Sequence, residues 1–364
     1  MEGQEILQDI VFVTLYGGVI MLNVVVALYL LLRRGNAIAP EVTSPRRLRM
    51  WSAAFMIVSA LSHIYWPFYA YNPTPTIYVL VCGLDILLLF PSIAGVLLSM
   101  LQDRHRVIWP VLVMLIPAFV IMSMCIIRGD DSLYALVSTY VMVLYALLML
   151  YMFFAVRHYR RWLRDNYADL ENKEIWQSLI ILAVFLLFFI MYSTTSVSSH
   201  LLAYLLQIDC IIIVGLLLWR VETLPQLSES APKEEDPSED EQKVSASPAI
   251  PSNIGPLLKK RCEDRQLYLQ NDLTLAQLAQ IIGTNRYYLS LYFAQQGQTY
   301  NAYINGLRVS HFIRLYHEAV ANNRIFTAQQ LAFESGFHSY STFSATFKQN
   351  IGMTVTQWIR STAE

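Results

Sequence analysis

Charged residues are scarce in this sequence. Lys, Arg, Asp and Glu make up 15% of the 364 residues, whereas hydrophobic residues make up 55%. Soluble globular domains carry about 25% charged residues. The apolar excess lies almost entirely before residue 222 and gives the chain a mean hydropathy of +0.41. The composition therefore excludes an ordinary soluble protein for the part of the chain before residue 222.

Cysteine is also rare, and its spacing excludes two structural classes. The four cysteines are Cys82, Cys125, Cys210 and Cys262, and no pair has the Cys-x-x-Cys spacing. A disulfide-stabilised scaffold or a zinc finger needs closely and regularly spaced cysteines. Because three of the four lie in apolar runs, we expect buried free thiols.

The sequence lacks the short motifs that mark common catalytic sites. It contains no His-Glu-x-x-His, no Gly-x-Ser-x-Gly and no phosphate-binding loop. These motifs supply a metal-bound water, an activated serine and a phosphate cradle, respectively. It also has no pair of carboxylates in a polar setting that could act as acid and base. We therefore expect neither enzymatic activity nor a cofactor, and we assign no metal site.

What the sequence does contain is a series of apolar runs long enough to cross a lipid bilayer. A helix needs roughly 20 apolar residues to cross the hydrocarbon core. Seven runs qualify, and they lack the regularly spaced polar residues of a soluble helix. They lie near residues 10–32, 50–71, 77–101, 109–127, 132–156, 175–193 and 201–219. We therefore expect an all-α fold in which residues 1–221 form a seven-helix transmembrane bundle with a retained first anchor.

The distribution of Lys and Arg between the loops predicts the orientation of the spans. Basic residues follow the odd-numbered spans, among them Arg46, Arg104, Arg164 and Arg220, whereas Arg128 alone lies on the opposite side. Cytoplasmic loops carry the excess of positive charge. We therefore expect a multi-pass protein of the cell inner membrane, with its N-terminus outside and everything after Arg220 in the cytoplasm.

Four polar side chains inside the predicted spans are candidates for a ligand site. His63, Asp85 and Asp209 each lie about eight residues from the outer end of their span, or roughly 12 Å deep. Their shared depth predicts a pocket open to the outside, with Asn23 in its wall. The alternative is structural: His63 pairs with one aspartate and holds helices together. A metal site that includes Cys82 is a third alternative, with nothing in the spacing to fix its geometry.

Residues 222–252 differ in composition from both neighbouring regions. They hold five prolines, six serines and an excess of acidic residues. Such a segment cannot bury enough apolar surface to offset the entropy lost on ordering, so we expect a disordered acidic linker. Its ends would lie about 30 Å apart on average, which lets the domain that follows reach DNA.

Residues 253–364 carry a net positive charge and a repeated helical pattern. Segments 275–283 and 328–336 both contain Leu-Ala-x-x-x-Gly, and each precedes a helix with two apolar residues four positions apart. Those apolar pairs are Leu289 with Phe293 and Phe343 with Phe347. A small Ala lets two helices approach, Gly supplies a turn with positive φ, and the apolar pair fixes the second helix. The pattern predicts two helix-turn-helix units joined by a long helix near 299–321.

On these motifs, residues 253–364 resemble the DNA-binding domain of the AraC/XylS family. The resemblance is carried by Tyr288-Leu289-Ser290, Phe293, Gly297, Tyr300, Gly336-Phe337, Phe343, Phe347-Lys348 and Gly352. It implies two helix-turn-helix units that read successive major-groove segments on one face of the DNA. The fusion to a membrane module resembles membrane-bound regulators of Bacteroidetes-type bacteria.

The sequence departs from that family at positions that matter for base recognition. The family usually places Arg where this chain has Leu291 and Ala345. Because Arg–guanine contacts are among the strongest base readouts, specificity is expected to depend on other side chains. The expected base contacts are Asn285, Arg286, Tyr287, Ser290, Ser339, Tyr340, Ser341 and Thr342. Arg308 and Lys348 are expected at phosphates, with a structural cap of the linker helix as the alternative for Arg308.

From these observations we expect a membrane-bound, sequence-specific transcription regulator that carries a signal from the bundle to a promoter. Its partners would be double-stranded promoter DNA, the lipid bilayer and an extracytoplasmic or membrane-soluble signal, with a homodimer as one arrangement on a tandem site. One alternative is a membrane transporter or enzyme whose tail provides autoregulation. Another is a bundle that serves only as an anchor, with proteolysis in the linker releasing a soluble regulator.

Overall fold

The computed structural model describes residues 6–33, 35–40, 42–170, 173–194, 200–227 and 253–363. Most of these residues are helical, and among them the only β pairing is an isolated bridge between Tyr167 and Thr274. The chain forms two compact units, Met1–Tyr159 with Ile175–Leu227 and Arg160–Glu174 with Ser228–Glu364. The expected all-α fold is confirmed, and most of the predicted linker, 228–252, lies outside the described residues.

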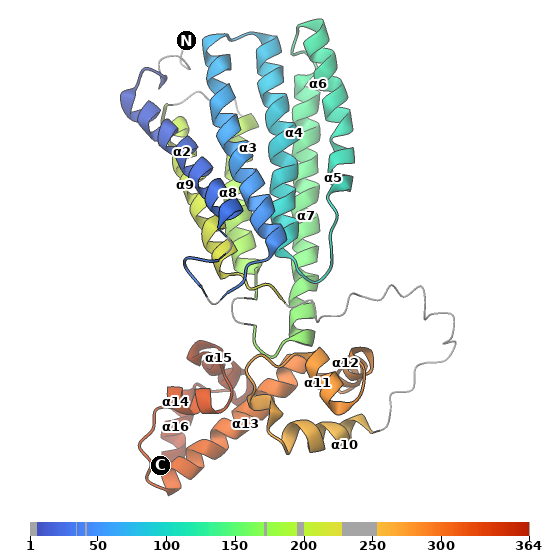
Figure 1. The fold of residues 1–364 in the computed structure, drawn as a ribbon, viewed down its shortest axis with the longest axis vertical. Helices are drawn as coiled ribbons and strands as arrows, with labels where there is room; N and C mark the ends of the chain where they lie inside the picture. The colour runs from blue at the N-terminus through green and yellow to red at the C-terminus, as the bar shows by residue number, and fades with distance from the viewer. Residues whose placement is uncertain are drawn as a thin grey trace, which may run out of the picture. The chain divides into compact units, whose positions relative to one another are not determined.

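The first unit consists of helices, most of them long (Figure 1). They are α2 (Ile10–Leu32), α3 (Arg46–Tyr71), α4 (Pro75–Met100), α5 (Trp109–Met114), α6 (Ile116–Arg128), α7 (Tyr134–Asn166), α8 (Trp176–Thr194) and α9 (His200–Thr223). Local signals set some of the ends. The Asp9 side chain accepts hydrogen bonds from the first backbone N–H groups of α2, and Gly129 ends α6 with a φ of +73°. These caps satisfy backbone groups that a helix leaves unpaired at its ends.

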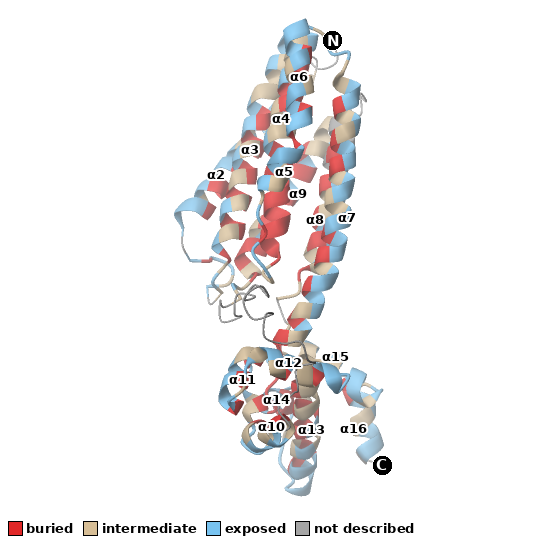
Figure 2. Ribbon diagram, turned by 90° about the vertical axis from the view of Figure 1, so that its right-hand side faces the viewer, coloured by how far each residue is buried: buried red, intermediate tan, exposed pale blue. Residues whose placement is uncertain are grey.

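Six helices in the described ranges are long and apolar enough to cross a membrane. They are Ile10–Leu32, Arg46–Tyr71, Pro75–Met100, Trp109–Arg128, Tyr134–Asn166 and Leu201–Thr223. The expected span at 175–193 corresponds to α8, whose described apolar part, Trp176–Phe188, is shorter. Many large apolar residues of these helices are exposed, such as Leu32 at 77% and Ile127 at 85%. Figure 2 shows exposed positions along the helices of the first unit. Exposure of so much apolar surface to water would be energetically unfavourable.

The fourth apolar run is broken in its middle. α5 ends at Met114 and α6 begins at Ile116, with Leu115 between them. Pro117 has no N–H to donate to the carbonyl of Val113, and its ring clashes with that carbonyl in a continuous helix. The proline therefore accounts for the change from one helix to two.

A buried polar network joins α2, α3 and α9 within the first unit. Glu222 of α9 is 0% exposed, and its carboxylate accepts hydrogen bonds from the Tyr29 hydroxyl at 2.8 Å and the Ile38 N–H at 3.0 Å. Arg49 of α3, also buried, donates to Asn36 Oδ1 at 2.9 Å. Buried charges are tolerated when their hydrogen-bonding capacity is used in this way. The network fixes the loop after α2 to the start of α3 and the end of α9.

The second unit contains two hydrophobic cores, each built around one helix pair. Its helices are α10 (Ile254–Leu258), α11 (Leu275–Ile282), α12 (Arg286–Gln295), α13 (Tyr300–Ala321), α14 (Ala328–Glu334), α15 (Tyr340–Ile351) and α16 (Val355–Ala363). A π-helical turn, η2 (Lys259–Glu263), and a 3₁₀ turn, η3 (Leu267–Leu269), connect α10 to α11. α11 with α12 and α14 with α15 form two helix-turn-helix units, and α13 joins them, as the repeated sequence pattern predicts.

Candidate nucleic-acid interface and bundle cavity

The first helix-turn-helix unit has the geometry that its sequence pattern predicts. Gly283 ends α11 with a φ of +80°, and Ala279 is 2% exposed in the contact between the helices. Leu289 and Phe293 are 0% and 2% exposed in the first core. This apolar pair fixes one face of α12 against the core and leaves the opposite face available for a DNA groove.

The second helix-turn-helix unit, α14 with α15, repeats this geometry with a tighter turn. Gly336 has a φ of +88°, and a Cβ atom placed on it would lie 2.8 Å from the Cα of Leu269. No side chain other than hydrogen fits such a close backbone approach. Phe343 and Phe347 are both 0% exposed and fix α15 against the second core.

The expected base contacts on α12 differ in their availability. Tyr287 is 59% exposed, and Ser290 is also exposed. Asn285 is exposed, but its Oδ1 accepts a hydrogen bond from the backbone N–H of Tyr288 at 2.9 Å, so the side chain caps α12. Arg286 is half-buried and its Nε donates to Oδ1 of Asn166 at 2.8 Å. Tyr287 and Ser290 therefore present the most accessible polar atoms of this set.

The expected contacts on α15 interact mainly within their own turn. Ser339 caps the helix, because its Oγ accepts from the N–H of Thr342 at 3.3 Å, and it lies 3.1 Å from Oγ of Ser341. Ser341 is exposed, whereas Thr342 and Tyr340 are half-buried. Lys348 is exposed toward the end of the same helix. Hydroxyl groups at the start of α15 thus remain accessible for DNA.

The structure buries Arg308, for which the sequence suggested a phosphate contact. The residue is 1% exposed, and its Nε donates to the carbonyl of Tyr268 at 2.7 Å. Its Nη2 donates to the carbonyl of Gln270 at 2.8 Å, and its guanidinium lies 5.8 Å from the centre of the Phe337 ring. Burial lowers the pKa of Arg308, and charges such as that of Asp169 oppose this shift. Arg308 therefore connects the two halves of the unit and is shielded from DNA.

His311, one turn further along α13, makes a second link between the halves. Its Nδ1 lies 2.9 Å from the Tyr268 hydroxyl and 3.0 Å from Nη2 of Arg314. Because an arginine nitrogen can only donate, Nδ1 acts as an acceptor and carries no proton. Burial lowers the pKa of His311, and the Arg314 charge lowers it further. The neutral imidazole thus belongs to the folded state of the unit.

A short segment that precedes α8 packs against the first helix-turn-helix unit. Residues 166–169, which we name the docking segment, are all buried. The carbonyl of Ala168 accepts hydrogen bonds from the side-chain amides of Asn301 at 2.6 Å and Asn305 at 3.0 Å. Tyr167 forms the isolated bridge with Thr274. No local sequence pattern predicts this contact, because the partners lie far apart in the chain and no periodicity relates them.

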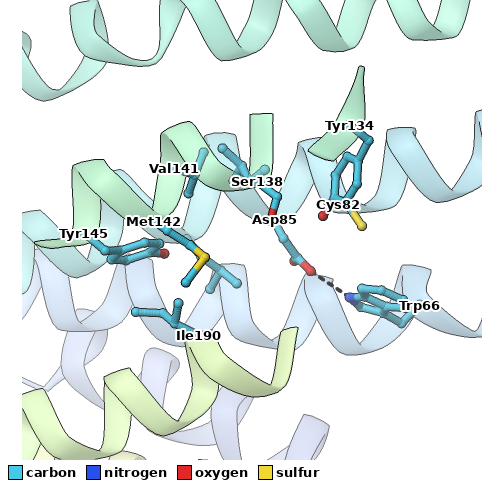
Figure 3. Close-up of a pocket in the computed structure, with 11 residues that line it drawn as sticks. Trp66, Cys82, Asp85, Tyr134, Ser138, Val141, Met142, Tyr145 and Ile190 are labelled. Carbon is cyan, nitrogen blue, oxygen red and sulfur yellow. Dashed lines mark hydrogen bonds between the residues drawn. The ribbon is translucent and has the colours of Figure 1, made fainter. Parts of the chain in front are cut away.

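The first unit contains a small cavity beside Asp85, with a volume of about 50 Å³ (Figure 3). Asp85 Oδ2 accepts a hydrogen bond from Trp66 Nε1 at 2.7 Å, and the Tyr65 hydroxyl donates to Oδ1. Cys82 and Tyr134 also line the cavity. A carboxylate among aromatic rings provides a setting for a small polar or cationic guest.

The other expected ligand residues do not line this cavity. His63 is buried, with Nε2 lying 3.2 Å from Oε1 of Gln207. Oδ1 of Asn23 and Oδ2 of Asp209 are buried without a hydrogen-bond partner among the described residues. Asp85 is thus the one member of the expected set found in the cavity lining. Within the described ranges, no group of three His, Cys, Asp or Glu side chains is placed to hold a metal ion.

Comparisons with known proteins agree with the geometry of the second unit. Residues 278–361 match a family model described as a helix-turn-helix domain. The match begins within α11 and ends in α16, so it includes part of α11 and all of α12 to α15. The comparison with curated proteins found no significant match, and neither did the comparison with solved structures. The C-terminal region therefore carries a helix-turn-helix domain, which supports a DNA-binding transcription regulator.

Proposed function

We propose that this protein is a membrane-bound, one-component transcription regulator. The helices of the first unit cross the inner membrane with the N-terminus outside, and the second unit reads promoter DNA in the cytoplasm. The observation that carries the proposal is the presence of two helix-turn-helix units and six long apolar helices in one chain. The exposed apolar helix faces support a lipid environment, and the position of the basic loops supports the orientation.

In this proposal α12 and α15 enter successive major-groove segments of one DNA face. Residues at the start of a recognition helix contact base edges, and hydroxyl groups can donate to or accept from several bases. The proposed base contacts are Asn285, Arg286, Tyr287, Ser290, Ser339, Tyr340, Ser341 and Thr342, and Lys348 is the proposed phosphate contact. The excess of basic over acidic residues in 253–364 supports association with the DNA backbone.

The first unit would receive the signal in this proposal. The cavity beside Asp85 supports an entry point for a small extracytoplasmic or membrane-soluble molecule. The buried polar groups of His63, Asp209 and Asn23 support a role in the same response, because each is costly to keep in an apolar bundle without a function. Ligand-dependent repacking around these groups would alter the helices that lead to the second unit.

Mapping of the genomic DNA bound by the intact protein tests this proposal. We expect discrete sites with two recognition elements about one helical turn apart. The double variant Tyr287→Ala/Ser341→Ala should lose these sites at unchanged abundance, whereas Ser361→Ala, an exposed position in α16, should retain them. Binding without enrichment of any sequence, or enrichment that the double variant leaves unchanged, would contradict the proposal.

A further inference from the structure

The docking segment is buried more completely than a short polar connection requires. Tyr167, Ala168 and Asp169 are 7%, 1% and 6% exposed, and Ala168 belongs to the first core of the second unit. Lys173 stabilises the fold of the connection, because its Nζ donates to the carbonyl of Asp169 at 3.0 Å and lies over the Tyr167 ring. Loops normally run over the surface, where water satisfies their backbone groups. Here the protein itself supplies the hydrogen-bond partners.

The segment meets the first residues of three helices. Tyr167 pairs with Thr274, the N-cap of α11, and Asn166 accepts from Arg286, the first residue of α12. Asn301, the second residue of α13, donates to the carbonyls of Tyr167 and Ala168. Helix starts are where a helix-turn-helix domain offers N–H groups to phosphates and side chains to bases. The segment therefore occupies groups that DNA would use.

We propose that the docking segment competes with promoter DNA for the first helix-turn-helix unit, and that its release raises DNA affinity. This inference rests on the proposed function. While the segment is docked, Arg286 is held by Asn166 and cannot enter a groove. Because competitor and domain belong to one chain, the competition is intramolecular and needs no high protein concentration.

The position of the segment in the chain links it to the apolar helices. Asn166 is the last residue of α7, which begins at Tyr134 in the cavity lining of the first unit. Because the segment begins at the last residue of α7, a change in the packing of α7 would alter the docking of the segment. The signal would act on promoter binding by changing the fraction of molecules in which the segment is docked.

The substitution Ala168→Glu tests the competition. A carboxylate cannot be buried at a position that is 1% exposed without a large desolvation cost, so the segment should leave its site. The matched control is Ala321→Glu, which makes the same charge change at an exposed position near the end of α13. Both are made in the full chain in lipid nanodiscs, and binding is measured to a site found by genomic mapping. We expect Ala168→Glu to bind DNA about tenfold more tightly despite its added negative charge. This gain corresponds to a wild-type chain in which the segment is released in about one molecule in ten.

A cross-link tests the opposite change. The bridge between Tyr167 and Thr274 places two backbones within reach of a disulfide, so the variant Tyr167→Cys/Thr274→Cys can lock the segment in place. Oxidation should weaken DNA binding, and a reductant should restore it. Each single-cysteine variant should show no such response.

Two results overturn the competition: unchanged or weaker binding by Ala168→Glu, or equal affinity of the oxidised and reduced cross-linked variants. If Ala168→Glu fails to fold, the cross-link alone decides. If the wild-type chain and all variants lack sequence-specific binding, the proposed function itself fails, and the competition fails with it.

Discussion

The two helix-turn-helix units share a sequence pattern and a fold but differ in their surroundings. In the first helix-turn-helix unit, Arg286 at the start of α12 donates a hydrogen bond to Asn166 of the docking segment. In the second, the hydroxyl groups at the start of α15 contact one another within a single turn. The local motif therefore determines how each unit folds. Distant parts of the chain determine which recognition helix is available to DNA.

The turn glycines provide the largest expected difference between the two units. Gly336→Ala should destabilise the second helix-turn-helix unit more than Gly283→Ala destabilises the first helix-turn-helix unit. Both substitutions place a side chain at positive φ, at a cost of about 1–2 kcal/mol. At Gly336 the new Cβ also meets the backbone of Leu269 at 2.8 Å, whereas at Gly283 the nearest atom is Nη1 of Arg261 at 3.7 Å. Proteolysis of the full chain at increasing urea concentrations gives the urea midpoint at which the C-terminal domain unfolds. Equal shifts of this midpoint in the two variants would refute the difference.

We expect Arg308 to stabilise the contact between the two helix-turn-helix units and to make no direct contact with DNA. Arg308→Leu removes the Nε donor from the carbonyl of Tyr268 and one of the donors from the carbonyl of Gln270, and a buried unpaired group costs about 1–3 kcal/mol. The same urea assay should show a large loss of stability. Among molecules that remain folded, the dependence of DNA affinity on salt should match the wild type. A flatter salt dependence would instead assign Arg308 to a phosphate.

Lys348 and Arg286 should respond differently to loss of charge. Lys348→Gln removes one phosphate contact and should reduce the slope of log affinity against log salt by about 0.9. Arg286→Gln should have little effect while the segment is docked, but a clear effect in the Ala168→Glu background. Titrations at several salt concentrations measure the wild type, Lys348→Gln, Arg286→Gln, Ala168→Glu and the double variant Ala168→Glu/Arg286→Gln. An equal effect of Arg286→Gln in both backgrounds would show that the segment leaves Arg286 free for DNA.

The smallest expected effect is a dependence of stability on pH. The folded second unit lowers the pKa of His311 through burial and the Arg314 charge. The unfolded chain therefore binds more protons at acidic pH, so the contribution of neutral His311 is complete above about pH 6.5 and is lost as the pH falls. His311→Gln retains an acceptor for Tyr268 and should flatten the pH profile. An unchanged profile in this variant would assign the acid sensitivity to other groups.

Much of the architecture follows from local sequence patterns. The apolar runs locate the long helices, and the repeated Leu-Ala-x-x-x-Gly pattern locates both helix-turn-helix units together with their turn glycines. These features depend on residues within one or two helical turns of each other, so periodicity and length contain the necessary information. The break at Leu115 is one local feature that hydropathy alone misses, since Pro117 leaves the run uniformly apolar.

Long-range polar contacts could not be predicted in the same way. Arg308 has the charge and exposure pattern of a phosphate contact in sequence, yet carbonyls of Tyr268 and Gln270 hold it inside the fold. Glu222 begins the predicted linker but is buried against Tyr29 and Ile38. In both cases the deciding partner is a backbone group or side chain far away in the chain. Such partners leave no periodic signal.

The side of the membrane on which the C-terminus lies tests the central claim most directly. A fluorescent reporter and a phosphatase reporter, each fused after Glu364, distinguish the cytoplasm from the outside. If the second unit reads DNA in the cytoplasm, the first fusion is fluorescent and the second is inactive. An active phosphatase fusion, with no fluorescence from the first, would separate the helix-turn-helix units from the chromosome and contradict the account.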